Sequence, residues 1–218
     1  MSAAASPDDP ALRAAIVSTA RAMNALPLNR GTSGNVSARC DSGFLITPSA
    51  LPYDRMAPED VVAMTLDGGV VSGSRAPSTE WPFHREIYRT RAEVRAIVHT
   101  HPPFGTTLAC LNRGIPAFHY MVAVAGGRDI RCARYATFGS DELARHAVEA
   151  LEGRKACLLA HHGMITVGDD LESALALSVE VEALAEMYWR AIQVEEPPRL
   201  SDEEMERVIS KFRSYRTS

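Results

Sequence analysis

The sequence lacks the features that mark membrane, secreted and nucleic-acid-binding proteins. Its apolar runs are all far shorter than the ~20 residues that span a bilayer. The opening residues, MSAAASPDDPALRAAI, contain no basic segment followed by an apolar core, so they do not resemble a secretory signal. The formal net charge is -4, which excludes a strongly basic surface for nucleic acid or anionic lipid. We therefore expect a cytoplasmic protein with no nucleic-acid partner and no membrane partner.

Cysteine is scarce, and several familiar motifs are missing. The 4 cysteines are scattered and form no CxxC pair, so we expect reduced core thiols without a chemical role. There is no Walker phosphate loop, and the glycines do not match the dinucleotide fingerprint. No motif places a lysine where it could form a Schiff base. The cysteines are Cys40, Cys110, Cys132 and Cys157.

The chain of 218 residues is long enough for one domain with a sizeable core. Residues 1–7 look like a flexible tail, and no internal repeat or low-complexity linker divides the rest. Short strands mixed with helices predict α/β or α+β layering in a single domain over residues 1–218. The expected helices are 9–26, 76–88, 106–111, 140–151, 171–194 and 201–215, and the expected strands are 43–47, 61–66, 94–101, 155–161 and 164–167.

Capping residues predict where several helices begin. Asp9 precedes a proline at the first helical position, and Ser140 precedes another helical pattern. Asp169 and Glu172 predict a capping box at the start of the longest helix. Hydroxyl residues at 78–79 predict the cap of the helix that contains the sequence EWPFHREIY.

Two histidines stand one residue apart at the end of an apolar run, in VRAIVHTHPP. Side chains two positions apart on a strand point the same way, so His99 and His101 share one face. Pro102 and Pro103 then end the strand, which places both rings where a cleft can open. The pair is either two hydrogen-bonded core histidines or two ligands of a metal ion.

A second histidine pair ends another apolar run, in LLAHHG. Adjacent residues of a strand face opposite ways, so only one of His161 and His162 should reach a site shared with His99 and His101. Three imidazoles suit a borderline divalent ion such as zinc, which keeps an open position when it is catalytic. Manganese and cobalt accept similar ligands. Strand alternation alone leaves the choice between the two adjacent histidines open.

Glu80 is the carboxylate that could complete such a site. It lies near the start of a helix, where glutamate is also common for capping and dipole reasons. If it faces the histidines, it could bind the metal or transfer a proton. We expect structural roles for the remaining histidines: His146 on a helix surface, His119 in an irregular stretch, and His84, which could also support the site.

Hydroxyl- and glycine-rich turns without lysine could bind a phosphate group. They are the segment GTSGN at 31–35, the turn Pro48-Ser49-Ala50 and the pair Ser78-Thr79. Backbone N–H groups and hydroxyls in such turns can form a neutral nest for an anion. Each turn taken alone is equally well explained as a plain turn.

Taken together, these motifs resemble the class II aldolase family, whose fold is shared by the adducin head. The resemblance covers nearly the whole chain, from about residue 29 to residue 215. HTH, HHG and PSTEW are typical of the family as a whole, whereas IPAFHYMVAVAGG and YATFGS are similar to its fuculose-phosphate branch. The resemblance implies an α/β fold with a central, mostly antiparallel sheet flanked by helices, and a homotetramer with active sites at subunit interfaces.

The resemblance also implies roles for individual residues. It favours His162 over His161 and adds Glu80 as the fourth ligand of one zinc ion per subunit. Ala50 stands where the family commonly has glycine, so its methyl group must be tolerated if the backbone amide there binds phosphate. Tyr120 would reach the active site of a neighbouring subunit, and Tyr215 would close over it. The implied metal ligands are Glu80, His99, His101 and His162, and the implied phosphate-binding residues are Gly34, Asn35, Ser49, Ser78 and Thr79.

The implied reaction is reversible cleavage of a ketose 1-phosphate, above all L-fuculose 1-phosphate, into dihydroxyacetone phosphate and L-lactaldehyde. The metal would act as a Lewis acid, Glu80 would move a proton at the carbon beside the carbonyl, and Tyr120 would exchange the proton of the aldehyde oxygen. Two alternatives stay open: another enzyme on this scaffold, such as a pentulose-phosphate 4-epimerase or a 5-deoxyribulose 1-phosphate aldolase, and a non-catalytic binding domain of the adducin kind. The second predicts a damaged metal set, whereas all four residues are present in the sequence.

Overall fold

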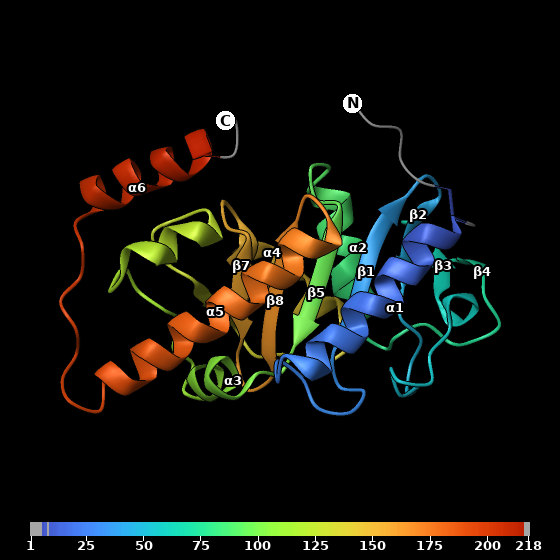
Figure 1. The fold of residues 1–218 in the computed structure, drawn as a ribbon, viewed down its shortest axis with the longest axis horizontal. Coiled ribbons are helices and arrows are strands. Elements are labelled where there is room, and N and C mark those ends of the chain that lie inside the picture. Colours follow the sequence, from blue (N-terminus) through green and yellow to red (C-terminus); the bar gives the residue numbers. More distant parts are fainter. Residues whose placement is uncertain (1–5, 8, 216–218) are drawn as a thin grey trace.

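A single eight-stranded sheet forms the centre of the molecule in the computed structural model, which describes residues 6–7 and 9–215 without the side chain of residue 215 (Figure 1). The strand order is β4-β3-β2-β1-β5-β8-β7-β6. Neighbouring strands are antiparallel except β6 and β7, which are parallel. The predicted mostly antiparallel sheet flanked by helices is therefore confirmed. The strands are β1 (Asn35–Cys40), β2 (Gly43–Ile46), β3 (Val62–Met64), β4 (Val70–Ser72), β5 (Ala96–Thr100), β6 (Arg131–Ala133), β7 (Ala156–Leu159) and β8 (Gly163–Gly168).

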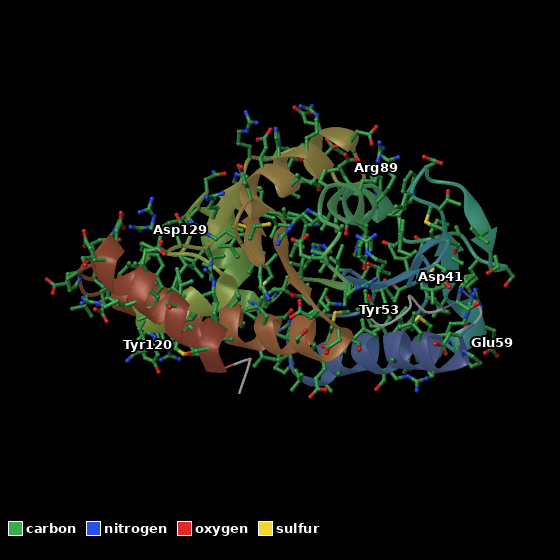
Figure 2. The ribbon with its side chains drawn as sticks, turned by 90° about the horizontal axis from the view of Figure 1, so that it is seen from above. Asp41, Tyr53, Glu59, Arg89, Tyr120 and Asp129 are labelled. Atoms are coloured by element: carbon green, nitrogen blue, oxygen red, sulfur yellow. The ribbon has the colours of Figure 1, made fainter. Side chains whose placement is uncertain are left out.

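Helices cover both faces of the sheet, as the view from above shows (Figure 2). Helices α1 (Pro10–Ala25) and α5 (Leu171–Ala191) pack on one face, and α2 (Trp81–Thr90) and α4 (Asp141–Leu151) pack on the other. The alternation of β5 divides the core accordingly: Ile97 joins the cluster under α2 and α4, and Val98 joins the one under α1. Burial on both faces explains why β5 reads as a continuous apolar run.

A third apolar cluster extends the core beyond the sheet. It is built from α3 (Pro103–Cys110), the 3₁₀ helix η2 (Tyr120–Ala125), the second half of α5 and α6 (Asp202–Tyr215). A further short 3₁₀ helix, η1 (Pro58–Asp60), lies before β3. None of the helices in the described ranges combines the length and hydrophobicity that a membrane span requires.

Two of the predicted helix caps are present and two are not. Oδ1 of Asp9 accepts from the backbone at the start of α1, and Oγ of Ser140 accepts from Leu143 N at 3.1 Å. The capping box at the start of α5 lies one residue later than predicted, on Asp170 and Ser173. At α2 the N-cap position falls on Glu80, which makes no capping hydrogen bond. Its carboxylate is therefore available for other contacts.

Sequence periodicity missed several short elements. β6 and η2 were not predicted, because a three-residue edge strand and a 3₁₀ turn carry no recognisable period. β8 begins at Gly163, one residue before the expected strand 164–167. His146 was expected on a helix surface, but it is buried, with Nδ1 3.2 Å from Arg134 O. Cys110 is exposed and thus departs from the expectation of core thiols, whereas Cys40 and Cys157 are buried as predicted.

Candidate active site

The two histidines of the HTH motif lie at the end of the central strand. His99 is in β5, opposite Asn35 of β1 on one side and Ile165 of β8 on the other. His101 lies one residue beyond the end of β5, just before the two prolines that lead into α3. The sheet therefore fixes the backbone that carries His99, and β5 ends just before His101.

His162 and Glu80 reach the same point from other elements. His162 lies in the turn between β7 and β8, and the following Gly163 brings that turn against β5. A Cβ atom at Gly163 would lie 2.5 Å from Thr100 O and 2.7 Å from Cδ2 of His101, so only glycine fits there. Glu80 enters from the start of α2. Three separate stretches of the chain thus meet at one point.

The four side chains form a compact group with their polar atoms turned inward. One ligand atom of each lies within 4.8 Å of all the others in the set Glu80, His99, His101 and His162. Nε2 of His99 is 3.1 Å from Oε2 of Glu80 and 2.9 Å from Nε2 of His101. Nε2 of His162 is 3.2 Å from Oε1 of Glu80. The other ring nitrogen of His99, Nδ1, is 2.9 Å from the carbonyl oxygen of Met164, which leaves a lone pair on the inward Nε2 when the ring is neutral.

The electrostatics of this group fit a bound cation. Burial alone would raise the pKa of Glu80, but the charge of His99 and the hydrogen bonds from His162 and His99 outweigh it and hold the pKa well below its usual range. Burial, followed by the charges of His99 and His162, lowers the pKa of His101 to about 3. Oε1 of Glu80 is buried without a well-aligned hydrogen bond among the described residues. One carboxylate and three imidazoles are a donor set that suits a divalent metal ion.

The two adjacent histidines point to different places, as predicted, although they lie in the turn after β7 and not in a strand. His162 is in the metal-type cluster. His161 adopts a left-handed backbone with φ 56° and turns away from it. Its Nε2 lies 3.2 Å from Nδ2 of Asn112, and its ring meets Tyr135 edge-on at 5.9 Å between centroids. His161 is thus a residue of the cavity rim.

A cavity of about 420 Å³ opens above the four-residue cluster. Of the predicted phosphate-binding residues, Ser49 and Thr79 line it, together with Ala50, whose φ is 56°. Thr32 and Ser33 of the predicted turn at 31–35 also line it. Sequence reasoning missed Tyr135, Ala136 and Phe138, because no local pattern marks a residue that tertiary packing brings to a rim. The described lining residues include no lysine or arginine; they are Thr32, Ser33, Ser49, Ala50, Thr79, Glu80, His101, Tyr135, Ala136, Phe138, His161 and His162.

The other predicted phosphate-binding residues make contacts inside the protein. Gly34 packs against β5, since a Cβ there would lie 2.5 Å from His99 O. Asn35 is buried and donates from Nδ2 to Oε2 of Glu80 at 3.0 Å. Ser78 is buried, and its Oγ accepts from Glu80 N at 3.3 Å. The backbone N–H groups of Ser49 and Ser78 donate to carbonyl oxygens at 3.0 Å each.

The two predicted tyrosines do not line this cavity. Tyr120 lies in η2, is 50% exposed and borders a different cavity between η2 and α6 (Figure 2). Tyr215 is the last residue of α6, and its side chain is outside the part of the chain that the structure describes. Any role of Tyr120 at the cluster therefore requires a second copy of the chain.

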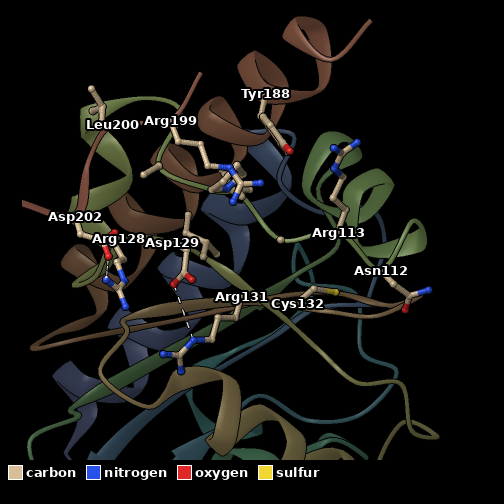
Figure 3. Close-up of a pocket in the computed structure, with 15 residues that line it drawn as sticks. Asn112, Arg113, Arg128, Asp129, Arg131, Cys132, Tyr188, Arg199, Leu200 and Asp202 are labelled. Carbon is tan, nitrogen blue, oxygen red and sulfur yellow. Dashed lines mark hydrogen bonds and ion pairs between the residues drawn. The ribbon is translucent and has the colours of Figure 1, made fainter. Parts of the chain in front are cut away.

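A second cavity, of about 530 Å³, lies away from the cluster near β6 and holds several arginines (Figure 3). Three of them already face acidic partners: Arg113 faces Glu196, Arg128 faces Asp202, and Arg131 lies 3.9 Å from Asp129. The carboxylates leave this cavity little excess positive charge, and no group for bond cleavage converges there. The catalytic candidate is the cavity above the histidines.

Comparison with known proteins agrees with this fold and site. The sequence profile described as "Class II Aldolase and Adducin N-terminal domain" matches residues 14–189. The chain belongs to this family. It is an enzyme of the aldolase side of the family, a lyase, in agreement with its relatives and with the intact set of metal-type ligands.

Relatives of known activity cover nearly the full chain. A 5-methylthioribulose-1-phosphate/5-deoxyribulose-1-phosphate aldolase of Rhodospirillum rubrum is 56% identical over 94% of this chain and 92% of its own length. The L-fuculose phosphate aldolase of Escherichia coli K12 is 46% identical over 92% of this chain and 93% of its own. A solved structure of an L-fuculose 1-phosphate aldolase matches with a TM-score of 0.91 and 40% identity, over 96% of this chain and 98% of that chain.

Proposed function

We propose that this protein is a metal-dependent aldolase that reversibly cleaves a ketose 1-phosphate into dihydroxyacetone phosphate and an aldehyde. The observation that carries the proposal is the convergence of one carboxylate and three imidazoles beneath a cavity with a hydroxyl-rich wall. The first substrates we propose are 5-methylthioribulose 1-phosphate and 5-deoxyribulose 1-phosphate, because the relative that acts on them shares 56% identity. L-Fuculose 1-phosphate is the second candidate, supported by relatives at 46% identity.

Glu80, His99, His101 and His162 would hold one divalent ion per subunit, with zinc as the proposed ion and manganese or cobalt as substitutes. An ion bound there supplies Lewis-acid chemistry, which draws electron density toward the ketose carbonyl when the carbon–carbon bond breaks. The outer hydrogen bond of His99 to Met164 O orients its ring for this task.

Glu80 and Tyr120 would carry the two proton transfers. In cleavage, Tyr120 takes the proton of the hydroxyl that becomes the aldehyde oxygen, and Glu80 delivers a proton to the carbon that becomes part of dihydroxyacetone phosphate. Tyr120 is half exposed and outside the cavity of its own chain, which supports the proposal that it acts in a neighbouring subunit of a homotetramer. The low pKa of Glu80 describes the carboxylate facing imidazoles, so acid–base work requires it to move away from them.

The phosphate end would be bound by the hydroxyl-rich wall. Ser49 and Thr79 line the cavity, and Thr32 and Ser33 add further hydroxyls. The predicted residues Gly34, Asn35 and Ser78 would contribute mainly by shaping this wall, since their polar groups already have internal partners. Tyr215, at the end of α6, would help to close the site.

The aromatic rim suits the apolar end of a deoxy or methylthio sugar. Tyr135 and Phe138 border the cavity and are 59% and 65% exposed, so their rings are available to a ligand. A thioether sulfur gains about 0.3–1.5 kcal/mol from an aromatic contact. One methylene in an apolar pocket discriminates by only about 1–3 kcal/mol, so we expect the enzyme to accept more than one aldehyde.

The test is a coupled assay for free dihydroxyacetone phosphate with the metal-loaded protein and three substrates. These are 5-methylthioribulose, 5-deoxyribulose and L-fuculose 1-phosphates. We expect product from all three and a higher kcat/KM for the two ribulose derivatives. A 4-epimerase on the same scaffold would keep both fragments bound and convert pentulose phosphates without releasing dihydroxyacetone phosphate. That result, or no turnover at all as in an adducin-like binding domain, would contradict the proposal.

A further inference from the structure

His84 is a fully buried histidine behind the metal-type cluster that the proposed mechanism does not use. It lies one turn after Glu80 on α2, with 0% exposure, and its ring stacks on Phe83 at 4.6 Å between centroids. Phe83 in turn meets the ring of His99 edge-on at 5.3 Å. Both nitrogens of the His84 ring have hydrogen-bond partners, so the residue is neither exposed nor merely apolar filling.

A continuous chain of short hydrogen bonds leads through His84 to Glu80. Ser37 Oγ lies 2.9 Å from the hydroxyl of Tyr88 and 2.7 Å from Nδ1 of His84. Nε2 of His84 lies 2.5 Å from Oδ1 of Asn35. Nδ2 of Asn35 then donates to Oε2 of Glu80 at 3.0 Å. Every member of the chain is buried.

Only one direction of donation satisfies all of these contacts. The Glu80 carboxylate accepts, so the amide of Asn35 must present its NH₂ group to Glu80 and its oxygen to His84. Nε2 of His84 must therefore carry a proton, and Nδ1 must accept one from Ser37. Ser37 can then accept from the hydroxyl of Tyr88. Burial, followed by the charge of His99, lowers the pKa of His84 to about 3, which is consistent with a neutral ring.

From this chain we infer that His84 is a positioning residue: it locks the Asn35 amide in the orientation that donates to Oε2 of Glu80, and so sets the resting position from which the Glu80 carboxylate moves to transfer a proton. An amide cannot pass a proton along, so His84 is not an acid or base in the reaction. If Asn35 turned over, its oxygen would face the carboxylate oxygen, and two acceptors would repel each other. The inference rests on the proposed function of Glu80.

The test is a double-mutant cycle between His84 and Glu80 in the metal-loaded full-length protein. His84→Leu removes the donor to Asn35, and we expect kcat to fall about 10–100-fold, the range typical of residues that orient a metal site, with KM changed less than about 3-fold. His84→Gln keeps an N–H group near the same place and should recover most of the loss. In a Glu80→Gln background, His84→Leu should change kcat by less than about 2-fold, because the group it positions is gone.

Two controls separate positioning from a general loss of structure. His146→Leu removes another buried histidine, on α4, and should leave kcat unchanged. Metal content and melting temperature are measured for every variant. If His84→Leu does not fold, Ser37→Ala provides the same cycle, because it removes the hydroxyl that donates to Nδ1 of His84 and so sets the His84 tautomer.

The outcomes distinguish a failure of the positioning role of His84 from a failure of the proposed aldolase function. Equal losses from His84→Leu in the wild-type and Glu80→Gln backgrounds would overturn the inference and leave the proposed function standing. Wild-type turnover of Glu80→Gln would remove the proton-transfer role of Glu80, and no release of dihydroxyacetone phosphate by the metal-loaded wild-type protein would remove the proposed function itself. Nitrogen-15 NMR of the wild-type protein gives an independent reading: we expect His84 to carry its proton on Nε2, and a proton on Nδ1 would contradict the positioning role.

Discussion

The histidines in and behind the cluster form two groups that differ in how their ring nitrogens are satisfied: His84 alone, and His99 with His101. His84 has a partner for each nitrogen, Ser37 on one side and Asn35 on the other. In the other group, the Nε2 atoms of His99 and His101 face each other at 2.9 Å, and neither can accept from the other while both are unprotonated. The first group is complete as protein alone, whereas the second has room for a cation that would satisfy it.

This difference distinguishes the proposed metal ligands from a structural histidine. Burial does not distinguish the two kinds of histidine, because His84 and His99 are both 0% exposed. Closeness of two histidines in the sequence does not distinguish them either, because His161 and His162 are adjacent and have different surroundings. The useful criterion is whether each polar nitrogen already has a complementary partner within the protein.

The largest expected effect comes from removing a nitrogen from the unsatisfied group. His162→Ala and His101→Ala should each lose bound metal and turnover together, with activity falling to the background of the assay. The matched control is His161→Ala, which removes the neighbouring ring at the cavity rim and should keep its metal. Metal analysis after dialysis measures the difference. Full metal occupancy in His162→Ala would contradict the proposal that His162 binds the metal and His161 does not.

The next effect separates metal binding from proton transfer. Glu80→Gln keeps an oxygen near the metal site but removes the ionisable group, so we expect metal to be retained and kcat to fall about 10²–10⁴-fold. Steady-state kinetics on metal-saturated protein give the value. Turnover close to wild type would show that the carboxylate is only a ligand.

A smaller effect is expected where a half-buried carboxylate already has hydrogen-bond partners. Glu182 of α5 accepts from Phe104 N and Gly105 N at 2.8 Å each, at the start of α3. Because α3 has no side-chain cap of its own, Glu182→Ala should lower the free energy of unfolding by about 1–3 kcal/mol. Glu186→Ala, which removes an exposed ion pair with Arg190 on the same helix, should change it by less than about 0.5 kcal/mol. Urea unfolding compares the two variants, and equal losses would contradict the capping role.

The smallest effect concerns the backbone of the cavity wall. Ala50 has φ 56°, a left-handed conformation that glycine adopts more easily than alanine. Ala50→Gly relieves that strain but makes the unfolded chain more flexible, so we expect a net gain of no more than about 1 kcal/mol. Thermal unfolding measures it, and a clear loss of stability would show that the methyl group contributes packing.

Residue patterns predicted much of this architecture because the important signals are local. The apolar run ending in HTH marks a buried strand with two rings on one face, and the structure has both at the end of β5. The choice between His161 and His162 was not local. It depends on a turn in which His161 is left-handed and Gly163 approaches β5, and that approach is set by the pairing of β8 with β5.

Other features could not be predicted from a single sequence for similar reasons. The contacts of Asn35 with Glu80 and His84 are one example: these partners lie 45 and 49 positions away, so nothing near Asn35 in the sequence indicates them. Tyr135 and Phe138 follow β6 in an irregular segment without periodicity, and only the packed fold brings them to the rim. The cap of α5 was misplaced by one residue because two adjacent aspartates offer the same chemistry.

The four residues of the cluster come from the start of α2, the end of β5 and the turn before β8. Binding of an ion by them would therefore raise the melting temperature of the protein. An unfolded chain does not hold these side chains together, so an ion that binds the native form shifts the folding equilibrium toward it. At a free ion concentration of 100 times its Kd, the shift is about 2.7 kcal/mol. Melting curves recorded across a series of chelator-buffered zinc concentrations would therefore yield the affinity of the site without any sugar phosphate.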